Sequence, residues 1–336
     1  MKRENSKIQE VVASGSYYEI GFTIGQETNE RIIDLIGKNK KNESDTFNCQ
    51  YREYLEYIKS YAYIMEEFKG MADGAGVDME DIIKLNIVEL NQPVDDCSTF
   101  IIKNSHSFIL AHNEDGREGD DIFLLRATYP TGTTILSFCY YGSLVGFSAN
   151  INSHGLIILC NALHANDKKI GEPKRVFARH LIECKTIESA IQKIEASQRA
   201  QGQNFTFIQN NRIVGVETSA SKLGITEVSE NYFHCNSYNF PEMIQYDSDI
   251  RRDECFYRNV EGKNAYQSLN SLEEARNLLS SHKNKPYCFC AHGKEGGDSL
   301  KTLGSMFIDY LSKKIWIGYG YTCSVELEHH HFNFDW

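Results

Sequence analysis

The thiol of Cys97 is the side chain in this sequence best placed to act as a nucleophile. It opens the run Cys97-Ser98-Thr99-Phe100-Ile101-Ile102, whose alternation predicts a β-strand. A turn over residues 103–107 leads to a second apolar strand at 108–111. The two strands predict a hairpin with the thiol at its head. If the chain is cut before Cys97, the new α-amine becomes a base beside the sulfur that it would activate.

Ten cysteines are scattered along the chain, mostly in apolar segments, as reduced core cysteines usually are. A buried structural thiol is therefore the alternative interpretation of Cys97. Cys288, Cys290 and His292 form the one cluster that resembles metal ligands. A second Cys/His pair at zinc-site spacing is missing, and alternation along a strand explains the cluster as well. The sequence thus predicts no metal, and residues 328–331 are expected to form a solvated tail.

Charge and hydropathy restrict the partners. The net charge is −11, and no basic patch interleaved with aromatic residues occurs, which argues against a nucleic-acid surface or an anionic membrane. No apolar run approaches the length of a bilayer span, and residues 1–7 lack the apolar core of a signal peptide. We therefore expect a cytoplasmic protein with neither nucleic acid nor membrane as partner.

The elements that must position Cys97 change in kind along the chain. After a short strand at 8–13, apolar residues at helical spacing make the first 90 residues mainly helical. From Cys97 onward, blocks of short strands alternate with helices. Such a pattern predicts an α+β protein in which helices cover the outer faces of sheets. We expect one compact unit, made of a helical segment 1–96 that stays docked if cut and a catalytic part 97–336.

Several short motifs follow one another along the chain. They are Gly15-Ser16-Tyr17-Tyr18-Glu19-Ile20-Gly21, residues 66–86, Asp96-Cys97-Ser98-Thr99-Phe100, residues 152–161, His234-Cys235-Asn236, Ser248-Asp249-Ile250-Arg251 and Thr302-Leu303-Gly304-Ser305. In this order they resemble the acyl-coenzyme A:6-aminopenicillanic acid acyltransferase family, also called peptidase C45-like, and more distantly the choloylglycine hydrolases. The resemblance covers nearly the whole chain.

The resemblance implies an N-terminal-nucleophile (Ntn) hydrolase fold, an αββα sandwich of two antiparallel sheets between helical layers. It also implies a precursor that cleaves itself between Asp96 and Cys97. The Cys97 sulfur would then attack an amide or thioester carbonyl and form an acyl-enzyme, while its α-amine moves the proton. No cofactor is implied.

By the same resemblance, Asp115 orients the amine of the nucleophile or of the substrate, and Asn161 and Asn236 supply donors to the oxyanion. His112, where relatives often carry arginine, lines the site or poises the thiolate. Apart from the resemblance, Arg251 or Arg252 is a candidate to pair with a carboxylate in the pocket. Plainer interpretations exist. Asp115 lies in good turn sequence, Asn161 ends an apolar strand, and Arg251 or the arginine after it suits an exposed helix start.

Two departures from the family pattern matter. Relatives place glycine before the nucleophile, whereas this chain has Asp96, whose side chain either slows the acyl shift of self-cleavage or assists it by acid–base action. Penicillin-forming enzymes carry an arginine before the position of Thr302, where this chain has Asp298-Ser299-Leu300. The penicillin nucleus is therefore not the expected acceptor.

Three functions remain open. The leading hypothesis is a self-processing cysteine amidohydrolase that cleaves the linear amide bond of a small N-acyl amine or amino-acid amide. The second is an N-acyltransferase of the same fold, for which a coenzyme A thioester would be a substrate. The third is a non-catalytic small-molecule binding protein in which Asp96 blocks maturation. A homo-oligomer is compatible with each.

Overall fold

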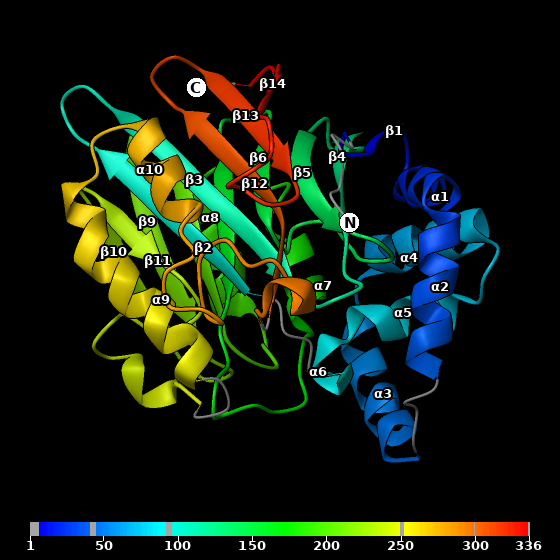
Figure 1. The fold of residues 1–336 in the computed structure, drawn as a ribbon. Helices are drawn as coiled ribbons and strands as arrows, with labels where there is room; N and C mark the ends of the chain where they lie inside the picture. Colours follow the sequence, from blue (N-terminus) through cyan, green and yellow to red (C-terminus); the bar gives the residue numbers. More distant parts are fainter. Residues whose placement is uncertain (1–6, 41–44, 92–95, 249–251, 299, 335–336) are drawn as a thin grey trace.

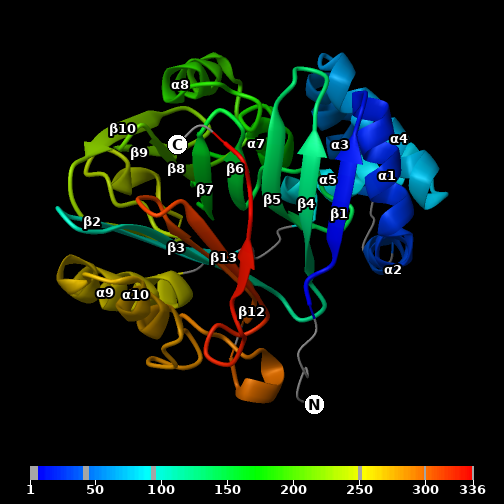
Figure 2. The same ribbon diagram turned by 90° about the horizontal axis from the view of Figure 1, so that it is seen from above.

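Two β-sheets lie face to face between layers of helices (Figures 1 and 2). The computed structural model describes residues 7–40, 45–91, 96–248, 252–298 and 300–334. The larger sheet has the strand order β1 (Glu10–Ser14), β4 (Ile122–Thr128), β5 (Thr134–Tyr140), β6 (Ala149–Asn152), β7 (Ile157–Ala162), β8 (Gln203–Gln209), β9 (Arg212–Thr218), β10 (Leu223–Val228). The smaller has the order β11 (Tyr232–His234), β2 (Asp96–Lys103), β3 (Phe108–Gly116), β12 (Lys301–Asp309), β13 (Lys314–Tyr319), β14 (Glu328–His330).

Helices cover the outer face of each sheet. The N-terminal helices are α1 (Tyr17–Glu27), α2 (Asn29–Asn39), α3 (Asp45–Ile58), α4 (Ala62–Ala75), α5 (Met79–Asn86) and α6 (Val88–Asn91). Helices α7 (Lys174–Arg179) and α8 (Ile187–Ala196) also lie on the larger sheet, and α9 (Arg252–Ala265) and α10 (Leu272–Leu279) lie on the smaller one (Figure 2).

Apolar side chains fill the three spaces between these layers. Ile101 and Leu110 of the smaller sheet meet Leu124 and Leu159 of the larger one between the sheets. The next residue of β2, Phe100, points the other way and packs under α10. Because both faces of each sheet are covered, some central strands have apolar residues at consecutive positions, and others alternate apolar with polar residues. The expected αββα sandwich is therefore confirmed.

The N-terminal segment is built into the sandwich. Strand β1 pairs with β4 in parallel, Glu10 opposite Leu124, which is the one parallel pair among the described strands. Helices α1 and α4 cross closely, since a Cβ added at Gly25 would lie 2.1 Å from the Met71 carbonyl oxygen and one at Gly70 would lie 2.0 Å from that of Tyr18. Only glycine allows such an approach.

A buried cation joins this segment to the rest of the chain. Arg179 of α7 donates to Glu67 of α4 at 2.8 Å and to Glu183 at 2.8 Å, and its guanidinium lies 4.2 Å from the ring centre of Tyr129. Arg179 and Glu67 are fully buried. Because breaking a buried ion pair costs about 3–5 kcal/mol, this contact holds the segment firmly against the sheet.

Two details differ from the sequence predictions. The expected solvated tail at 328–331 contains the edge strand β14, in which His330 lies opposite Ile315. Strand β10, residues 223–228, was not predicted from the sequence. It pairs with β9 and lies at an exposed edge of the larger sheet. In the part of the chain that the structure describes, no helix is long and apolar enough to cross a membrane.

Candidate active site

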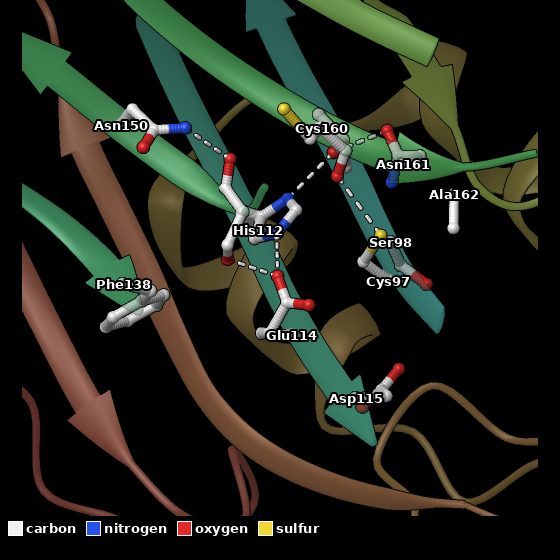
Figure 3. Close-up of polar contacts among 12 residues, drawn as sticks. Cys97, Ser98, His112, Glu114, Asp115, Phe138, Asn150, Cys160, Asn161 and Ala162 are labelled. Carbon is white, nitrogen blue, oxygen red and sulfur yellow. Dashed lines mark hydrogen bonds and ion pairs between the residues drawn. The ribbon is translucent and has the colours of Figure 1, made fainter. Parts of the chain in front are cut away.

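The Cys97 sulfur lies between the two sheets, against the end of β7. The residue is 3% exposed, and Sγ donates to the Cys160 carbonyl oxygen at 3.1 Å (Figure 3). The backbone N–H of Ala162 donates toward the sulfur, and Asn236 Nδ2 lies 3.8 Å from it. Two N–H donors beside a nucleophilic sulfur are the components of an oxyanion site.

The side-chain amide of Asn236 reaches both the sulfur and the nitrogen of Cys97. Its Oδ1 accepts from the Cys97 backbone N–H at 3.1 Å and from Arg258 Nη2 at 3.0 Å. Its Nδ2 donates to the Ala162 carbonyl oxygen at 2.9 Å. These bonds fix the amide plane, so Asn236 would hold a free amine at position 97 as well as an oxyanion.

To act as a nucleophile, the Cys97 thiol would have to lose its proton to a base. Burial raises its pKa well above the ordinary value, and the Glu114 carboxylate raises it further, against the opposing effect of the Ala162 N–H. The thiol therefore keeps its proton at neutral pH. In the uncut chain the Cys97 nitrogen is a peptide N–H and cannot accept that proton. An amine able to do so exists only once the bond between residues 96 and 97 is broken.

A buried cation lies between two carboxylates on the opposite face of the same hairpin. Asp96 of β2 lies opposite Asp115 of β3. Arg258 of α9 donates through Nη2 to Asp96 at 2.6 Å and lies 3.4 Å through Nη1 from Asp115. Thr302 of β12 donates to the other Asp115 oxygen at 2.6 Å. All four residues are 1% exposed or less.

This ion cluster has one strongly perturbed acid. Burial raises the pKa of Asp115 to about 7, although Arg258 and the Thr302 hydroxyl oppose the shift. Burial lowers the pKa of Arg258, but the Asp96 and Asp115 carboxylates outweigh it and raise that pKa overall. Arg258 thus stays charged while Asp115 can change its protonation near neutral pH.

His112 belongs to a hydrogen-bonded network between the sheets. Thr99 Oγ1 donates to Asn161 Oδ1 at 3.1 Å, so it accepts from His112 Nδ1 at 2.9 Å. Nε2 of His112 faces Glu114 at 3.1 Å, and Glu114 also accepts from the Tyr140 hydroxyl. One ring nitrogen and one carboxylate oxygen of this network lie within 4.8 Å of the Cys97 sulfur. These are metal-ligand types, but protein groups already pair with them.

A cavity of about 540 Å³ adjoins this site through Asn236. Two carboxylates, Asp247 and Asp253, and two aromatic rings, Phe256 and Tyr257, are among its walls. Lysine and arginine are absent from the described residues that line it. Acidic and aromatic walls suit a small organic cation, since ring faces and carboxylates both attract positive charge.

The structure brings together two of the predicted site residues and places others apart from them. Cys97 and Asn236 are in direct contact. Asp115 lies on the other face of the hairpin, since Cys97 is opposite Glu114, and it contacts Arg258, which also donates to Asn236. Asn161 meets Thr99, and its Nδ2 has no partner within the described residues. Arg251 lies outside the described residues.

Arg258 is the main residue that the sequence analysis missed. It lies on α9, seven residues after Arg251 in the sequence. The buried positions of α9 include Cys255, Arg258 and Glu261, a spacing of three that marks its inner face. Because exposed positions of α9 carry Phe256, Tyr257 and Val260, apolar periodicity does not mark this inner face, and the buried arginine could not be recognised from the sequence.

Comparisons with known proteins bear on the family to which the chain belongs. The chain is 25% identical over 355 residues to the beta-alanyl-dopamine/carcinine hydrolase of Drosophila melanogaster, with 90% of each chain covered. It also matches the penicillin V acylase structure from Agrobacterium tumefaciens at 12% identity and a TM-score of 0.41, covering 69% of this chain and 84% of that one. The family model of the acyl-coenzyme A:6-aminopenicillanic acid acyl-transferases matches residues 102–322, a stretch that begins five residues after Cys97 and takes in Asp115, Asn161, Asn236 and Arg258. Because this match spans well over half of the sequence, the chain belongs to the acyl-coenzyme A:6-aminopenicillanic acid acyl-transferase family.

Proposed function

We propose that this chain is a cysteine amidohydrolase that cuts its own Asp96–Cys97 bond and then hydrolyses a small N-acyl amine. Membership of the family makes it an enzyme that hydrolyses amides or transfers acyl groups. The observation that carries the finer proposal is the position of the Cys97 sulfur, with the Ala162 N–H and Asn236 Nδ2 beside it, next to a cavity that Asn236 also lines.

The reaction follows from these groups. The Cys97 α-amine takes the thiol proton as Sγ attacks the substrate carbonyl carbon, and Ala162 and Asn236 donate to the oxyanion. The C–N bond breaks as the α-ammonium returns the proton to the leaving amine, which leaves a thioester on Cys97. The amine then deprotonates water, which attacks the thioester and releases a carboxylic acid and the thiol. The sum is amide plus water giving acid plus amine.

The cavity favours a substrate that carries a positive charge. Asp247 and Asp253 supply negative charge, and Phe256 and Tyr257 supply ring faces. The fruit-fly relative is a hydrolase of β-alanyl-dopamine and carcinine. We therefore propose N-acyl amines of this kind, with a cationic group on either side of the amide, as the substrate class.

The segment 1–96 is proposed to remain docked after cleavage. Support comes from strand β1 in the larger sheet, the close crossing of α1 and α4, and the buried pair of Glu67 with Arg179. Cleaved enzyme should therefore separate into two pieces on a denaturing gel but elute as one species in native gel filtration. Elution of the two pieces as separate species contradicts docking.

Cys97→Ala and Cys97→Ser test the catalytic proposal. Purified wild type should consist of pieces 1–96 and 97–336 and should hydrolyse β-alanyl-dopamine or carcinine, whereas the alanine variant should remain full length and inert. A full-length wild-type chain that is also unreactive toward thiol-directed amide probes would sink the proposal. Ligand binding retained by such a chain would instead favour the non-catalytic binding protein.

Acyl transfer is the second candidate, because the family to which the chain belongs is named for an acyl-transferase. A transferase and a hydrolase share the thioester on Cys97 and differ in which molecule attacks it. Consumption of an acyl-coenzyme A that depends on added amine identifies a transferase. Release of free amine from an N-acyl amine in buffer alone identifies the hydrolase that we propose.

A further inference from the structure

Two histidines and two cysteines converge at one place outside the active site. His282 follows α10, Cys290 and His292 lie in the next loop, and Cys323 lies in the turn between β13 and β14. One ligand-type atom of each lies within 4.8 Å of the other three. His282 and Cys323 are distant in the sequence from each other, and the fold brings both next to Cys290 and His292. They supply the second Cys/His pair that is missing from the sequence around Cys290.

The spacing of these atoms suits a tetrahedral metal ion. His282 Nε2 lies 3.1 Å from His292 Nε2, which lies 3.2 Å from Cys323 Sγ and 3.7 Å from Cys290 Sγ. Zinc binds nitrogen at about 2.0 Å and sulfur at about 2.3 Å, so the edges of such a tetrahedron are roughly 3.3–3.8 Å. The observed separations differ from these edges by a few tenths of an ångström.

Neighbouring groups orient two of the four ligand side chains, His292 and Cys290. The Tyr321 ring stacks on His292 with centroids 4.2 Å apart, which fixes the plane of the imidazole. The backbone N–H of Cys323 donates toward the Cys290 sulfur, as amides do toward metal-bound thiolates.

We propose that His282, Cys290, His292 and Cys323 bind one zinc ion. Two thiolates and two imidazoles in tetrahedral array are the donor set that selects zinc over harder divalent ions. With four protein ligands the site is closed, which is the arrangement of a structural metal and leaves no position for substrate. The ion fastens the loop after α10 to the turn before β14.

The proposed ion is linked to Asp115 through Ala291 and Thr302, by two hydrogen bonds in series. Ala291, between two of the ligands, donates to Thr302 Oγ1 at 3.0 Å and accepts from the Thr302 N–H at 2.8 Å. Thr302 Oγ1 in turn donates to Asp115. Fixing Ala291 therefore fixes the hydroxyl that orients the Asp115 carboxylate.

Metal analysis of the untagged full-length protein, purified without added metal under reducing conditions, tests this proposal. We expect one zinc per chain, and X-ray absorption should show two sulfur and two nitrogen neighbours at about 2.3 and 2.0 Å. Replacement by Co²⁺ should give thiolate-to-cobalt charge-transfer absorption. Cys323→Ser and His282→Gln should each lose most of the bound metal.

Matched controls lie close by. Cys288→Ser removes a thiol of the same loop whose sulfur contacts the Cys290 carbonyl oxygen and Asp298 rather than the cluster, and His329→Gln removes an exposed histidine of β14. Both should keep the full zinc content. Zinc retained equally by all variants, no zinc and no cobalt charge transfer in wild type, or a Cys290–Cys323 disulfide in the protein as isolated each overturn the proposal.

Discussion

Removing the buried cation Arg258 should destabilise the uncut chain strongly. In a Cys97→Ala background, which keeps the chain intact, Arg258→Met leaves Asp96 and Asp115 facing each other without the guanidinium that lies 2.6 and 3.4 Å from them. Loss of one partner from a buried ion pair costs about 3–5 kcal/mol. For unfolding by urea with a slope near 3 kcal/mol per molar, the midpoint should fall by about 1–2 M.

Arg212→Met is the matched control. Arg212 also contacts two carboxylates, Glu188 at 2.6 Å and Glu227 at 2.9 Å, but it is 45% exposed. Such surface pairs contribute about 0–1 kcal/mol, so the urea midpoint should hardly move.

A double-mutant cycle decides whether charge is the cause. Adding Asp96→Asn to Arg258→Met removes one of the two stranded carboxylates and should recover a good part of the lost stability. Equal shifts for the Arg258 and Arg212 variants, or no recovery in the double variant, would refute the reasoning.

The remaining predictions concern packing, catalysis and pH. Gly25→Ala should lower the urea midpoint by the equivalent of about 1–3 kcal/mol, because the added Cβ would lie 2.1 Å from the Met71 carbonyl oxygen. The control Gly37→Ala adds a Cβ with nothing within 4 Å and should raise the midpoint slightly. Equal effects of the two substitutions would contradict the close contact between α1 and α4. Asn236→Ala should lower kcat about 10²–10³-fold in steady-state assays of cleaved enzyme, and an unchanged kcat removes Asn236 from the oxyanion site. Because the pKa of Asp115 is raised from 3.8 to about 7, the folded chain binds this proton more tightly than the unfolded chain. The contribution of this proton to the free energy of unfolding is fully present below about pH 4 and is lost as the pH rises through 7. Asp115→Asn should therefore reduce the fall of the urea midpoint over this pH range. If the midpoint of the variant falls as in wild type, other groups cause the fall.

The sequence predicted the nucleophile hairpin because its signals are local. Strand alternation around Cys97 and the turn after residue 103 place the thiol, and the structure extends β3 to Gly116. The face on which Asp115 lies could not be predicted in the same way. It depends on the register of the hairpin, and a shift of one residue moves every side chain to the other face.

Groups joined only by tertiary contacts were beyond the sequence. Arg258 meets Asp96 across more than 160 residues, and Cys323 meets His292 across thirty. Neither pair has a spacing that periodicity can reveal. Strand β14 was missed for another reason, since its residues Glu328–His330 are polar and gain their pairing from β13 alone.

The most direct test of the central claim is to trap the acyl group on the nucleophile. Wild-type enzyme mixed with β-alanyl-dopamine, quenched in acid during turnover and digested, should yield a peptide that begins at Cys97 and carries the mass of one acyl group on its sulfur. An acyl group on another residue, or turnover by Cys97→Ala at the wild-type rate, would contradict the account.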